Sequence, residues 1–182
     1  MENLVEVKNL KKKYGSKEAV RGISFNIKEN EILGLLGPNG SGKTTTIGMM
    51  LGLLKPSSGE ILIDGKKIEE NRIETLQKIN FISPYIELPK KLTVKQNLIV
   101  YCKLYNVSNI KNRIEYLVEK LRLENLLNRV TGELSSGQKN RASLAKALIN
   151  NPSVLFLDEP TASLDPEIGD FVRSFLENYK KE

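Results

Sequence analysis

Residues 37–44 read Gly-Pro-Asn-Gly-Ser-Gly-Lys-Thr, which matches the pattern G-x-x-x-x-G-K-[ST] at every specified position. The apolar run at residues 32–36 predicts a strand before it, and residues 44–54 predict a helix after it. Glycines in such a loop let backbone N–H groups approach a phosphate. Lys43 supplies a mobile charge for β- and γ-phosphates, and the Thr44 hydroxyl can bind Mg²⁺. The alternative is a glycine-rich turn in an unrelated α/β domain, which the order of strand, loop, Lys-Thr and helix disfavours.

The composition is that of an ordinary globular chain. Its 182 residues are 40% hydrophobic and 27% charged, enough for one domain with a sizeable core. No apolar run approaches the ~18 residues of a membrane span, and the first residues lack the pattern of a secretory signal. The single cysteine, Cys102, cannot form an internal disulfide and lies in an apolar segment, which favours a packing role in a reducing cytosol. The chain contains no histidine.

Basic residues concentrate in residues 85–129. This quarter of the chain holds nine Lys or Arg against four Glu, which supplies +5 of the net charge of +6. A solvated helical surface is the simpler explanation. An anionic neighbour, either phospholipid headgroups or nucleic acid, is the alternative.

Hydrophobic periodicity predicts β-structure first and helices later. Alternating apolar residues predict strands around Val5 and Val7 and around residues 23–27, and a hairpin around Asp64-Gly65. We predict a short helix at 72–78 and an extended segment at 79–82. The pattern Thr93-x-x-Gln96 is a capping box that opens a helix through about residue 105, and a second helix follows from about residue 110.

A second candidate site follows the apolar strand predicted at residues 154–157. Asp158 comes next and can hold a Mg²⁺ shell, while Glu159 can orient or deprotonate a water beside a γ-phosphate. Four apolar residues followed by two acids would be weak evidence alone. The segment Leu-Ser-Ser-Gly-Gln at 134–138 strengthens it, because it lies just before a helix predicted at 139–149 that leads into this strand.

These segments together resemble the ATP-binding cassette family over the whole chain. Residues 37–44 resemble its Walker A motif, 134–138 its LSGGQ-type signature, 155–159 its Walker B motif with the following Glu, and 163–165 its D-loop. Tyr14 falls where the family stacks an aromatic side chain on adenine. Taken alone, Tyr14 would be an ordinary aromatic residue at a strand end.

The resemblance implies an α/β P-loop NTPase core with an N-terminal antiparallel β-subdomain and a helical insert at about 85–145, all within one domain of residues 1–182. It implies ATP and Mg²⁺ as cofactors, Lys43 and Glu159 as catalytic residues, and Thr44 and Asp158 as metal ligands. The implied nucleotide-binding residues are Tyr14, Gly37, Pro38, Asn39, Gly40, Ser41, Gly42, Lys43, Thr44 and Thr45. The implied signature residues are Leu134, Ser135, Ser136, Gly137 and Gln138, and the D-loop residues are Ser163, Leu164 and Asp165.

Two cassettes of this family pair head to tail, so that each ATP lies between one Walker A motif and the other subunit's signature. The resemblance therefore implies a second cassette, separate transmembrane permease subunits, and a cytoplasmic location on the inner face of the membrane. An exporter is the leading hypothesis, with the basic segment 85–129 at the permease side and no direct nucleic-acid contact. The alternatives are a non-transport cassette acting on nucleic acid or the ribosome, and a degenerate regulatory nucleotide-binding subunit.

Three features depart from the family pattern. Ser136 stands where the signature has a third-position Gly, and Pro84 stands where a Gln normally reaches Mg²⁺ and the attacking water. The family's switch His is missing, together with the central strand that should follow the helix predicted at 166–179. From this we expect a C-terminally truncated chain that binds ATP poorly and hydrolyses it slowly, because the unpaired backbone of such a sheet is costly.

Overall fold

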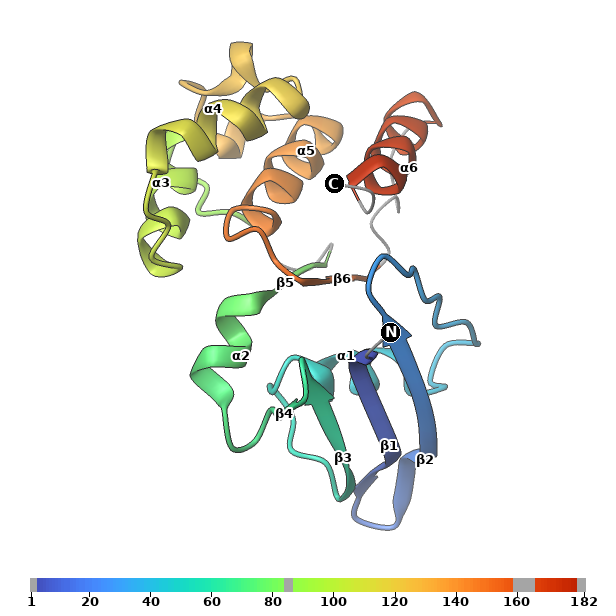
Figure 1. The fold of residues 1–182 in the computed structure, drawn as a ribbon. Coiled ribbons are helices and arrows are strands. Elements are labelled where there is room, and N and C mark those ends of the chain that lie inside the picture. Colours follow the sequence, from blue (N-terminus) through green and yellow to red (C-terminus); the bar gives the residue numbers. More distant parts are fainter. Residues whose placement is uncertain (1–2, 84–86, 159–165, 180–182) are drawn as a thin grey trace. The chain divides into compact units, whose positions relative to one another are not determined.

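The computed structural model describes residues 3–83, 87–158 and 166–179, which fall into two compact units, Met1–Leu76 and Gln77–Glu182 (Figure 1). The first unit is built on an antiparallel sheet with the strand order β2-β1-β3-β4. Its elements are β1 Asn3–Tyr14, β2 Lys17–Lys28, α1 Lys43–Met50, β3 Ser58–Ile63, β4 Lys66–Lys67 and α2 Arg72–Lys78, which runs into the second unit.

Alternating apolar residues build the core of the first unit, as predicted. Val5 and Val7 on β1 are buried, and β1 pairs with β2 on one side and β3 on the other. The predicted hairpin at Asp64-Gly65 joins β3 to β4, with both residues at positive φ. The N-terminal antiparallel sheet of the predicted fold class is therefore confirmed.

The prediction of a strand at residues 32–36 is wrong. These residues form neither helix nor strand, and Leu36 is fully exposed. A strand is stable only when its backbone N–H and C=O groups are paired, and no described strand pairs with this segment. The apolar run alone could not supply that partner.

Helix α1 ends four residues earlier than predicted. Gly52 takes a left-handed conformation with φ 64°, and its N–H donates to the carbonyl of Met49. The N–H of Leu53 donates to the carbonyl of Gly48. These two bonds are the Schellman arrangement that terminates a helix and satisfies its last carbonyls.

The second unit carries a parallel pair of strands and a set of helices. β5 pairs in parallel with β6 in continuous register from Ile79↔Val154 to Ile82↔Leu157. The elements are β5 Ile79–Ile82, α3 Val94–Leu104, α4 Ile110–Lys120, η1 Glu124–Leu126, η2 Thr131–Glu133, α5 Ser136–Ala147, β6 Val154–Leu157 and α6 Pro166–Tyr179. No helix in the described part of the chain is long and apolar enough to cross a membrane.

The predicted capping box at the start of α3 is confirmed. The Thr93 hydroxyl accepts from the N–H of Gln96 at 3.1 Å, and the Gln96 side chain accepts from the N–H of Thr93 at 2.9 Å. The box satisfies two N–H groups that a helix start leaves without intrahelical partners. It therefore fixes where the helical part of this unit begins.

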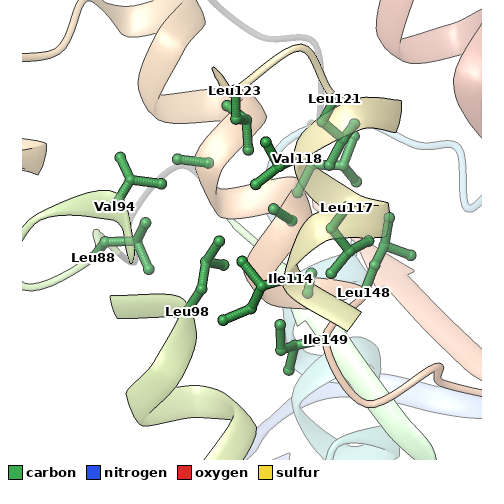
Figure 2. Packing of buried hydrophobic residues seen from close by; sticks show 14 of the residues in the cluster. Leu88, Val94, Leu98, Ile114, Leu117, Val118, Leu121, Leu123, Leu148 and Ile149 are labelled. Atoms are coloured by element: carbon green, nitrogen blue, oxygen red, sulfur yellow. The ribbon is translucent and has the colours of Figure 1, made fainter. Parts of the chain in front are cut away.

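One hydrophobic cluster holds the helices of the second unit together (Figure 2). Leu98 on α3, Leu117 on α4 and Leu148 after α5 are all fully buried in it. The face of α6 expected to be apolar packs against the same cluster, with Val172 buried and Phe171, Phe175 and Leu176 partly buried. Cys102 is buried here too, in agreement with its predicted packing role, and burial raises the pKa of its thiol.

Part of the basic charge in residues 85–129 is used within the second unit. Lys90 pairs with Glu87 at 2.6 Å and lowers the pKa of that carboxyl through a hydrogen bond. Arg113 donates to the carbonyl of Ile149 at 3.2 Å and also bonds the carbonyl of Leu148, so it satisfies carbonyls beyond the end of α5. These contacts give some of the segment's cations a structural role.

Truncating Leu98 to Ala should destabilise the chain by about 2–5 kcal/mol, because it removes a side chain with 0% exposure and leaves a cavity. The matched control is Leu104→Ala on the same helix, where the side chain is 66% exposed. Urea unfolding followed by circular dichroism should show a lower midpoint for the first variant only. Equal midpoints for the two variants would contradict this assignment of the core.

Candidate functional site

The loop at residues 37–44 leads directly into α1. Gly42 is the N-cap residue, with φ 97°, and no side chain bonds to the N–H groups of the first turn. The first turn also contains no acidic residue. An uncapped helix N-terminus presents N–H donors and the positive end of the helix dipole, which together favour an anion.

The Lys43 side chain lies across this loop. Its ammonium group donates to the carbonyl of Gly37 at 2.6 Å and to that of Pro38 at 3.1 Å. Both acceptors are neutral, so they orient the positive charge without neutralising it. A phosphate at the loop would meet a cation already held beside the N–H groups of α1.

Gly42 has a packing role that the sequence reasoning missed. A Cβ at this position would lie 2.4 Å from the carbonyl oxygen of Ala19 and 3.2 Å from a methyl carbon of Val20, both on β2. A Cβ at Gly40 would meet nothing within 4 Å. Gly42 therefore lets the start of α1 approach the sheet, whereas Gly40 lies in open space where a ligand could approach the backbone.

The three threonines that follow Lys43 differ in exposure. Thr44 is exposed, Thr45 is half-buried and Thr46 is buried, with its hydroxyl donating to the carbonyl of Gly42 at 2.9 Å. The hydroxyl of Thr44 is thus accessible for the role in Mg²⁺ binding that the sequence predicts.

Tyr14 ends β1 with a half-exposed ring, and the ammonium of Lys12 lies 5.1 Å from its centroid. Adenine stacking on this ring stays a prediction.

Asp158 lies at the carboxyl end of β6 and is half-buried. Its N–H donates to the carbonyl of Ile82 at 2.9 Å, so the backbone pairing of β5 with β6 continues to this residue. The hydroxyl of Ser83 donates to the Asp158 Oδ2 atom at 3.5 Å. Sequence reasoning missed Ser83, although one signal could have found it: neighbouring parallel strands end at the same edge of a sheet, so the residues that follow them meet.

The signature segment forms the start of α5, which begins at Ser136 rather than at the predicted residue 139. The cause is a second capping box. Ser135 Oγ accepts from the N–H of Gln138 at 3.3 Å, and Gln138 Oε1 accepts from the N–H of Ser135 at 3.1 Å. Leu134 and Gly137 are buried, which fixes the segment against the helices.

Ser136 occupies the first position of α5, where the family pattern has Gly. It is absent from the residues with positive φ, so its backbone conformation is open to any L-residue. The Gly-to-Ser departure therefore causes no backbone strain.

Each unit offers an oxygen ligand of the type that suits Mg²⁺. Thr44 in the first unit has an exposed side chain with a hydroxyl, and Asp158 in the second has a half-buried carboxylate. Hard oxygen ligands of these types bind Mg²⁺ together with substrate phosphates. No group of three or more His, Cys, Asp or Glu side chains gathers in the described residues, and a phosphate-assisted site does not need one. Glu159, the D-loop residues Ser163, Leu164 and Asp165, and Pro84 lie outside the described residues.

Comparisons with known proteins identify the family of this chain. The model of the ABC transporter family matches residues 20–162, so the chain belongs to this family. It is 41% identical over 165 residues to the Nod factor export ATP-binding protein I of Burkholderia orbicola (strain AU 1054), covering 90% of this chain and 54% of that protein. It is 40% identical over 169 residues to the bacitracin transport ATP-binding protein BcrA of Bacillus licheniformis, covering 91% of this chain and 54% of that protein.

The fold is likewise that of a known cassette. A dimeric structure of a bacterial ABC transporter cassette superposes with a TM-score of 0.86 at 29% identity, covering 97% of this chain and 83% of that one. The predicted family and fold class are therefore confirmed. The chain spans about half the length of the two curated relatives named above.

Replacing Gly42 by Ala should lower stability more than replacing Gly40 by Ala. Both residues have positive φ, 97° and 82°, so both variants carry backbone strain of about 1–3 kcal/mol. Only the Gly42 variant also drives a methyl group into the carbonyl of Ala19. Thermal unfolding followed by circular dichroism should give the lower midpoint for Gly42→Ala, and the reverse order would contradict the packing role.

Proposed function

We propose that this chain is the ATP-binding and ATP-hydrolysing part of an ABC exporter, acting on separate transmembrane subunits. The observation that carries the proposal is the uncapped N-terminus of α1 with the Lys43 ammonium held across its loop. Family membership and the export and transport functions named for the two relatives support it. The cargo would be set by the membrane subunits.

The chemistry of ATP binding is divided among a few groups. We assign the β- and γ-phosphates to the N–H groups at the start of α1 and to Lys43, and the adenine ring to Tyr14. Thr44 and Asp158 would hold Mg²⁺, which neutralises phosphate charge when bound. Glu159 would orient or deprotonate the attacking water. Each assignment uses a side chain whose type suits the task.

A second cassette would complete each ATP site through the signature segment. The Ser135 hydroxyl could donate to the ATP of that second cassette and still cap α5. It accepts from the N–H of Gln138, and its own hydrogen remains free to donate. The N–H groups at the start of α5 add further donors. The related bacterial cassette that forms a dimer supports pairing of this kind.

The proposed location is the cytoplasmic face of the membrane, where the chain would bind permease subunits peripherally. The basic segment 85–129 supports this, because part of its charge remains on the surface of the helices. Lys95 and Lys103, for example, are exposed. Such residues would favour a surface near anionic headgroups.

Changing Lys43 to Ala should weaken ATP binding at least tenfold, because it removes the only side-chain cation placed in the loop by the described contacts. Binding can be measured with a fluorescent ATP analogue. Lys55→Ala is the matched control, since it removes an exposed lysine of the same unit outside the loop. Unchanged affinity in the Lys43 variant would contradict the proposal.

A further inference from the structure

We propose that Ser83 is a positioning residue for Mg²⁺ binding at the proposed ATP site. Its hydroxyl would hold the Asp158 carboxylate in the orientation that receives the metal ion. The inference rests on the proposed ATP site and deepens it. Pro84 stands where the family pattern has a Gln, and a proline side chain can neither donate nor accept a hydrogen bond. The adjacent Ser83 provides a hydroxyl that does contact Asp158.

The backbone brings Ser83 and Asp158 together. Ile82 and Leu157 form the last pair of the β5–β6 register, and the N–H of Asp158 donates to the carbonyl of Ile82 at 2.9 Å. Ser83 and Asp158 therefore leave the two strands at the same edge. Both residues are half-buried, so their contact competes less with water than a contact on an open surface.

The strand that carries Ser83 is held by a buried polar cluster. The Lys146 ammonium, on a residue only 9% exposed, donates to Asn80 Oδ1 at 3.3 Å and to the carbonyl of Phe81 at 3.4 Å. Asn80 in turn donates to Asn150 Oδ1 at 2.9 Å. These contacts attach β5 to α5 and to the turn before β6, so the position of Ser83 is set by rigid elements rather than by a loop.

The hydrogen bond leaves the carboxylate able to bind a cation. The Ser83 hydroxyl donates to Oδ2 at 3.5 Å, a distance at which the bond is weak and can shorten when the site is loaded. The lone pairs of Oδ1 remain for Mg²⁺. Partners that orient a ligating carboxylate in this way typically contribute 10–100-fold to metal affinity. Ser83 would therefore act on the metal through Asp158.

The test compares binding of a fluorescent ATP analogue by the 182-residue chain in Mg²⁺ and in EDTA. The quantity of interest is the gain in affinity that Mg²⁺ provides. Ser83→Ala should reduce this gain about tenfold while leaving affinity in EDTA unchanged, and Asp158→Asn should reduce it as well. Ser153→Ala, an exposed serine at the opposite end of β6, is the control and should retain the full gain.

A second pair of variants separates the hydroxyl from the shape of the side chain. Ser83→Thr keeps a hydroxyl and Ser83→Val has nearly the same shape without one, so the gain should survive far better in the first. Equal gains in this pair, or a full gain in Ser83→Ala, would overturn the proposal. The EDTA arm tests the phosphate loop separately through Lys43→Ala. If Mg²⁺ gives the unsubstituted chain no gain, the role of Ser83 falls while the loop still stands.

Discussion

The parallel pairing of β5 with β6 is the constraint on which the second unit depends. Four consecutive residue pairs fix the register, and the N–H of Asp158 extends the pairing beyond the last of them. Successive side chains of a strand point to opposite faces of the sheet. If one strand shifted by one residue against the other, each of its side chains would move to the opposite face. It would also separate Ser83 from Asp158. The chemistry at this edge is thus a consequence of backbone register.

A buried lysine helps to maintain that register. The Lys146 ammonium lies 5.2 Å from the centroid of the Phe81 ring and 5.3 Å from that of the Tyr101 ring. Burial lowers the pKa of this group because the charged form loses its hydration. The contacts of the ammonium with carbonyl oxygens and aromatic faces offset part of that loss. A cation here connects α5 to β5 at several points, which an apolar side chain of similar length could not do.

Most elements can be predicted from the sequence because their signals are local. The capping box of Thr93 and Gln96 acts within four residues, and the helix at Arg72–Lys78 and the strand at Ile79–Ile82 have the bounds that the sequence predicts. The site motif at 37–44 is local in the same sense. The sequence predicts a helix directly after this loop, and α1 begins at Lys43.

The features that the sequence does not predict depend on distant partners. Residues 32–36 are apolar enough for a strand, yet a strand also needs neighbours that local sequence cannot specify. The contact of Gly42 with Ala19 and that of Ser83 with Asp158 span 23 and 75 residues of chain. Each contact exists only after another element has been placed. The roles of Gly42 in packing and of Ser83 beside the carboxylate therefore require the fold.

The two helix N-termini assigned to phosphate differ in a way that suits different tasks. At α1 the N-cap residue is a glycine without a side chain, so every N–H of the first turn stays available and Lys43 adds a full charge. At α5 the N-cap residue is Ser135, whose hydroxyl already occupies the N–H of Gln138. The start of α1 therefore has the stronger field for an anion. The start of α5 keeps a stable cap of its own. This suits the proposed role, because such a surface would have to stay folded with or without an ATP bound against it.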